Sequence, residues 1–196
     1  MTPGARLQAA IDLLDDILAN PRKPADGIAN AFFRARRFIG SADRRAVAER
    51  VFGILRRRAQ LQWWLARAGA SSELTGRGLV VADLALSDGL SADHIAGQFD
   101  GGRFRPLPFE RDERAVLRAM AGKALGHADQ PIDVRFNIPD WIEPELRAAL
   151  GATAEQEYAA MNAPAPVDLR VNLLKGDRVA AQRALKAENV ATSPTE

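Results

Sequence analysis

The sequence predicts a mainly α protein, on three observations. Apolar residues recur at helical spacing over most of the first 160 positions. Capping residues, glycines and prolines separate these periodic stretches. The chain has 196 residues, 47% of them apolar, which is enough to bury a core. We therefore expect a compact helical bundle, with no convincing strand before residue 167.

Three helices are expected at the start of the chain, over residues 3–20, 26–37 and 41–68. Thr2 can cap the first helix, and Pro3 suits its first position. Asp26 can cap the second helix, and Ser41 follows a glycine break and starts the third, the longest. The third helix either lets Arg58 reach out past its apolar stripe or bends near Gly53.

Three more helices are expected over residues 79–87, 92–99 and 110–126, with a loop at 100–109 before the last. Ser91 can cap the middle one. Together these six helices form a predicted helical domain, residues 1–128.

The pattern changes after this domain. Residues 129–162 are expected to form a helical connector, with Thr153 capping its last helix. A Pro-rich break at 163–166 then precedes an alternating stretch, Val167 to Leu173, which predicts a strand, and Asp177 can cap a following helix. One strand and one helix are not a stable unit. Residues 163–196 are therefore expected to be the start of a second domain.

Charge is spread unevenly along the chain. The net charge is +2, but residues 34–58, here called the basic segment, hold nine arginines against Asp43 and Glu49. A segment of charge +7 favours a polyanionic partner, and arginine matches phosphate well. A solvated helix face explains the same composition, and composition alone leaves both interpretations open.

The sequence offers little catalytic chemistry. Without cysteine, it can form no disulfide, thiolate metal site or cysteine nucleophile. It contains no Gly-rich phosphate loop after a strand and no hydrolase or zinc-protease motif. Ser91, Asp93 and His94 are neighbours, but capping and surface roles explain them better than a triad. We expect no catalytic, cofactor-binding or metal-binding residue.

The aromatic residues allow two roles. Trp63 and Trp64 are expected to pack in and beside the core rather than stack on bases. Phe104 lies between Arg103 and Arg105 in a loop, which suits stacking on single-stranded RNA, and a core anchor is an equal alternative. The N-terminus lacks an apolar signal region, and no stretch could span a membrane, so we expect a cytoplasmic protein.

Three motifs in register resemble the N-terminal region of the Sun-type (RsmB-like) ribosomal RNA cytosine-5 methyltransferases. Ser41-Ala-Asp-Arg44 with Val51-Phe-Gly-Ile-Leu-Arg56 resembles a signature of their NusB-like helical domain. Asn137-Ile-Pro-Asp-Trp-Ile142 resembles their connector. The stretch from Ala163 to Lys175 resembles the strand that opens their RRM-like subdomain. The second half of the bundle departs from the family pattern.

The resemblance implies an RNA-binding domain that does not catalyse. In this family the donor S-adenosylmethionine and two acting cysteines belong to a further, Rossmann-like domain, so the chain alone is expected not to be an enzyme. The implied partners are ribosomal RNA and that C-terminal methyltransferase domain, with no membrane. The expected RNA contacts are Arg36, Arg37, Arg44, Arg45, Arg56, Arg57, Arg103 and Arg105. Arg170 and Asn172, in the strand motif, are more plausibly structural.

Two other functions fit the same residues. NusB-like bundles also serve as transcription antitermination adaptors that bind RNA and a ribosomal protein, and here the arginines would meet acidic protein. Alternatively, the domain only packs against its catalytic domain, with its charge solvated. A reading frame that continued into a cysteine-bearing methyltransferase domain would favour the first function over the adaptor.

Overall fold

A computed structural model describes residues 1–163, 165 and 167–195. It divides into two compact units, Met1–Asn162 and Ala163–Glu196. Its regular elements are helices, and the described residues contain no strand, so the predicted mainly α class is confirmed. No described helix is both long and apolar enough to cross a membrane. Pro164 and Pro166, in the predicted break, and Glu196 lie outside the described residues.

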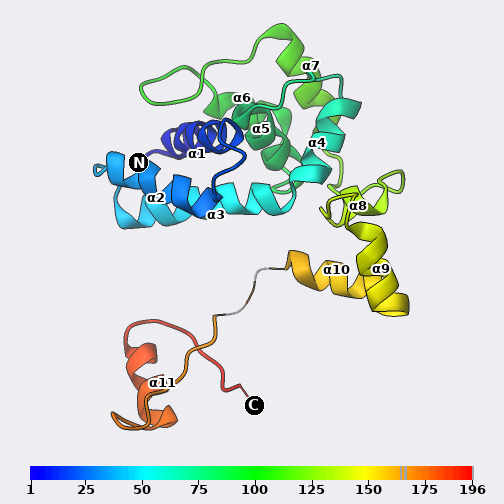
Figure 1. Ribbon diagram of the computed structural model, residues 1–196. Coiled ribbons are helices and arrows are strands. Elements are labelled where there is room, and N and C mark those ends of the chain that lie inside the picture. The colour runs from blue at the N-terminus through cyan, green and yellow to red at the C-terminus, as the bar shows by residue number, and fades with distance from the viewer. Residues whose placement is uncertain (164, 166, 196) are drawn as a thin grey trace. The chain divides into compact units, whose positions relative to one another are not determined.

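The helices follow one another along the chain as shown in Figure 1. Unit 1 contains α1 (Pro3–Leu18), α2 (Ala25–Ala35), α3 (Ser41–Arg56), α4 (Arg58–Arg67), α5 (Gly76–Leu86), α6 (Ala92–Gln98), α7 (Arg111–Met120), α8 (Ile132–Arg135), α9 (Glu143–Leu150), a 3-10 turn (Gly151–Thr153) and α10 (Ala154–Asn162). Unit 2 contains α11 (Arg178–Ala187).

Helix α5 is the centre of the bundle. It packs against α1, α3, α4, α6 and α7, and every residue from Leu79 to Leu86 is buried (Figure 1). Its first residue must be a glycine, since a Cβ on Gly76 would lie 2.5 Å from the carbonyl oxygen of Ile11. The Gly76 N–H also donates to Asp15 Oδ1 at 2.6 Å. A small residue and one hydrogen bond thus set the close approach of α5 to α1.

The single unbroken helix predicted over residues 41–68 is wrong, because the helix is interrupted at Arg57, four residues beyond the bend near Gly53 that the sequence allowed. The break exposes backbone groups, and Asn137 meets two of them. Its Oδ1 accepts from the Ala59 N–H at 2.8 Å, and its Nδ2 donates to the Leu55 carbonyl at 3.3 Å. Asn137 comes from the connector motif, so the connector stabilises the helix break.

Three smaller expectations also need correction. Asp26 does not cap α2, which starts one residue earlier behind Pro24, so Asp26 lies in its first turn. Helix α7 ends at Met120 rather than near Gly126. Thr153 lies in a 3-10 turn, where its hydroxyl donates to the Leu150 carbonyl rather than capping α10. The caps at Thr2, Ser91 and Asp177 are confirmed.

The strand predicted over Val167–Leu173 does not form. A strand needs a neighbour for its backbone hydrogen bonds, and the described part of unit 2 supplies none. Helix α11 does form, with Asp177 Oδ1 accepting from the Ala180 N–H at 2.7 Å. No described residue of unit 2 is buried, so this unit has no core of its own.

Asn137 offers a test of how the helix break is held. Its φ is +52°, a region that glycine enters at low cost and alanine does not. We expect Asn137→Gly to lower the free energy of unfolding by about 2 kcal/mol, because two part-buried backbone groups lose their partner. Asn137→Ala should cost about 1 kcal/mol more, because it adds backbone strain. Urea denaturation measures both, and a glycine variant as stable as the parent would contradict this account.

Candidate nucleic-acid interface

The nine arginines of the basic segment fall into three groups by what they contact. Arg50 and Arg57 pair with acids. Arg34, Arg36 and Arg44 bond to backbone carbonyls. The other four are exposed and have no acidic partner among the described residues, and these are Arg37, Arg45, Arg56 and Arg58. The segment therefore supplies both structural and free positive charge.

Asp83 forms ion pairs with two of these arginines. Its side chain is only 1% exposed and lies on α5, the central helix. Arg50 Nη1 donates to Asp83 Oδ2 and Arg57 Nη2 to Oδ1, each at 2.7 Å. Arg50 Nη2 also reaches Asp88 Oδ2 at 2.8 Å. Arg57, expected to contact RNA, is thus engaged within the bundle.

A tight turn joins α2 to α3. The Ile39 N–H donates to the Arg36 carbonyl at 3.0 Å, and Ile39 is buried. Arg44 Nε donates to the Ile39 carbonyl at 2.7 Å. The Arg36 guanidinium folds back over the Phe32 ring, 3.7 Å from its centroid. Arg37 and Phe38, at the turn's tip, are exposed.

Arg45 and Arg56 lie on one face of α3. They are eleven residues apart, three helical turns, and so about 16 Å apart along the axis. Glu49 lies near this face and is exposed. Asp43, the other acid of the segment, accepts hydrogen bonds from the N-terminal ammonium and from Arg6, and these bonds hold the pKa of its carboxyl below the usual value.

The loop at 100–109 presents the other two expected arginines. Arg105 Nη1 pairs with Asp100 Oδ2 at 2.6 Å. The Arg103 guanidinium lies 4.9 Å from the centroid of the Phe104 ring. Phe104 is 69% exposed and has a φ of +63°, so it is not a core anchor.

The remaining candidates pack or cap, as expected. Trp64 is buried, and its indole N–H donates to the Leu125 carbonyl at 2.8 Å. Trp63 packs edge-on against Trp64 and beside His127. The Ser91 hydroxyl accepts from the His94 N–H, which is a cap and not a triad contact. Within the described ranges, no group of acids and histidines could hold a metal ion.

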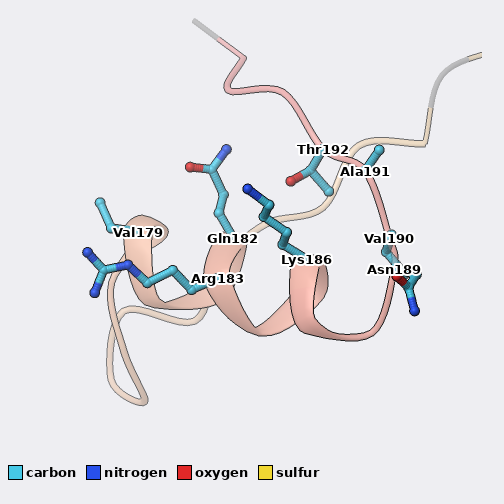
Figure 2. A pocket seen from close by; sticks show the side chains of 8 residues that line it. All are labelled: Val179, Gln182, Arg183, Lys186, Asn189, Val190, Ala191 and Thr192. Atoms are coloured by element: carbon cyan, nitrogen blue, oxygen red, sulfur yellow. The ribbon is translucent and has the colours of Figure 1, made fainter.

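Unit 2 has a shallow hollow along α11. Val179, Gln182, Arg183 and Lys186 line it from the helix, together with the chain from Asn189 to Thr192 (Figure 2). Figure 2 shows Gln182 and Lys186 rising on one side of α11, where Thr192 also lies. No buried polar side chain faces the hollow. It is therefore an uncovered helix surface rather than a built site.

The second part of the chain is similar to a known domain family. Residues 138–196 match the family described as "Methyltr_RsmF/B-like, ferredoxin-like domain". The match begins at Ile138, inside the stretch that the sequence assigned to a helical connector. Residues 138–196 thus carry the ferredoxin-like domain signature of RsmF/RsmB-like methyltransferases.

Curated relatives extend the likeness over most of the chain. The chain is 32% identical over 161 residues to the ribosomal RNA small subunit methyltransferase B of Xylella fastidiosa strain 9a5c, and equally to that of strain Temecula1. These alignments cover 78% of the chain but only 37% and 36% of the relatives. The resemblance to the Sun-type (RsmB-like) methyltransferases is confirmed. No solved structure matches the chain.

Sequence reasoning missed two residues of this region, one exposed and one buried. Phe38 is 81% exposed at the tip of the α2–α3 turn, and its place between Arg37 and a glycine break was the available signal. Asp83 stands within an apolar run and was not singled out. The available signal was that Arg50 and Arg57 share one flank of the predicted helix. An isolated acid inside an apolar helix indicates a buried partner for such arginines.

The buried Asp83 leads to a stability prediction. We expect Asp83→Asn to lower the free energy of unfolding by about 2–3 kcal/mol, because it removes the charge that two partly exposed arginines share. Asp88→Asn is the matched control, since Asp88 is an exposed partner of Arg50 alone. It should cost about 0.5 kcal/mol or less. Equal, small losses in thermal or chemical unfolding would show that Asp83 does not organise the bundle.

Proposed function

We propose that residues 1–128 are the RNA-binding, substrate-recognition domain of an S-adenosylmethionine-dependent ribosomal RNA 5-methylcytosine methyltransferase, and that the chain does not itself catalyse. The similarity to two ribosomal RNA methyltransferases supports the substrate class. The exposed arginines of the basic segment support the mode of binding, because they are free to meet phosphates. Such a substrate would place the protein in the cytoplasm.

The contact surface that we propose centres on Arg37, Arg45 and Arg56. Arg36 and Arg44 border it, and both keep unused donors beyond their backbone bonds. We assign Arg57 a supporting role instead, because its guanidinium holds Asp83. Arg103 and Arg105 would form a separate, secondary contact in the loop at 100–109.

The described residues do not fit the methyl donor. A Rossmann-type donor site lies at the carboxyl ends of parallel strands, and the described residues form none. The chain also has no cysteine to attack the cytosine ring. We therefore propose that donor binding and catalysis belong to a further domain of the intact protein.

The exposed apolar residues of unit 2 indicate that it contacts another part of the intact protein. Apolar side chains along its extended segment and the following turn are exposed, namely Val167, Leu169, Leu173 and Leu174. We propose that they pack against the rest of a ferredoxin-like domain, where the extended segment would find its strand neighbour. A ribosomal protein remains an alternative partner for the chain, as an adaptor would require.

Salt dependence tests the proposed RNA contact. We expect the chain to bind small-subunit ribosomal RNA with an affinity that falls steeply with salt. The double variant Arg45→Gln/Arg56→Gln should weaken binding and make the slope of log affinity against log salt shallower by about 1 to 2. The control is Arg118→Gln, an exposed arginine of α7. Filter binding or fluorescence anisotropy measures these affinities.

An affinity that does not change between low and high salt would contradict phosphate contact altogether. Normal RNA binding by the double variant would instead show that α3 does not contact the RNA. In that case the segment's charge would be solvated surface or would meet an acidic protein.

A further inference from the structure

We propose that Phe38 is a stacking platform for an unpaired RNA nucleotide, with Arg37 beside it to hold a phosphate. This inference rests on the proposed function and adds a substrate class, single-stranded RNA. Phe38 is the most exposed aromatic side chain among the described residues, at 81%. Single exposed apolar residues are common on proteins, so exposure alone does not carry the proposal. The proposal rests on how the turn is anchored and on the positive charge next to it.

The turn that presents Phe38 is held from three sides. Ile39 anchors it in the core, and Arg44 ties the Ile39 carbonyl to α3. Arg36 folds back onto Phe32 and the bundle. Only Arg37 and Phe38 are left at the tip, between two fixed neighbours. An aromatic ring on a fixed backbone loses little freedom on binding, which favours a flat, π-faced ligand such as a base.

Unpaired positive charge adjoins this turn in sequence. Arg37, directly before Phe38, and Arg45, in α3, are exposed and have no acidic partner among the described residues. Asp43, the nearest acid in sequence, is engaged by the N-terminal ammonium and Arg6. Cations beside an open aromatic face match the phosphates and base of one nucleotide, and duplex RNA keeps its bases stacked away from such a ring.

Phe104 shows by contrast why Phe38 is the better platform. The Arg103 guanidinium already lies over the Phe104 ring, and Arg105 is paired with Asp100. Among the described residues, no cation lies over the Phe38 ring. The Phe38 face is therefore open to a base.

The test compares two RNA probes on the 196-residue chain. One is a labelled oligouridylate of about twelve nucleotides, within the usual site size, and the other is a perfect duplex of the same length. Fluorescence anisotropy should give Phe38→Ala an affinity for the single strand about tenfold weaker than the parent's. Duplex affinity should not change. Phe38→Trp should restore single-strand binding, because it restores a stacking surface. The salt slope should stay the same, since no charge is lost.

Met161→Ala is the control, because Met161 is an apolar residue of α10 with 66% exposure and lies outside the proposed RNA contacts. It should bind both probes as the parent does. If the parent binds both probes and Phe38→Ala binds the single strand equally well, the stacking proposal falls while RNA binding stands. Phe38 would then suit contact with a protein. If the parent binds neither RNA, the proposed function and the stacking proposal fall together.

Discussion

The bundle depends on one buried carboxylate. Asp83 lies on the central helix α5. Arg50 reaches it from within α3, and Arg57 reaches it from the junction where α3 ends and α4 begins. A buried charge without partners is costly, so this group fixes where the α3–α4 corner meets α5. Asn137 satisfies the backbone that the corner opens. Part of the basic segment therefore stabilises the bundle and is not available to bind a ligand.

The arginines of the basic segment have two roles, and only the exposed ones can bind a ligand. Two of its arginines neutralise the buried acid, while the group of four stays exposed and without an acidic partner in the described ranges. Because the structural pairs fix α3, Arg45 and Arg56 stand at a set spacing on its outer face. Positive charge on a fixed scaffold favours a polyanion, and ribosomal RNA is the polyanion named by the chain's relatives.

Local signals in the sequence predicted much of this fold. The caps at Thr2, Ser91 and Asp177 and the apolar periodicity gave the helices. The sequence allowed a bend near Gly53, but the break at Arg57 could not be located in the same way, because the groups that contact it, Asp83 and Asn137, are distant in sequence. The strand over residues 167–173 failed for the opposite reason. Its alternating pattern is genuine, but a strand exists only beside a neighbour. Exposure of Phe38 depended on tertiary packing of Ile39, which periodicity does not reveal.

The proposed contact with ribosomal RNA lies on the exposed face of the basic segment. Ultraviolet cross-linking of the chain to small-subunit ribosomal RNA, followed by mass spectrometry of the linked peptides, tests it most directly. We expect linked peptides from residues 34–58, concentrated at the α2–α3 turn and the outer face of α3. Links confined to α7 or to unit 2, with none in the basic segment, would contradict it.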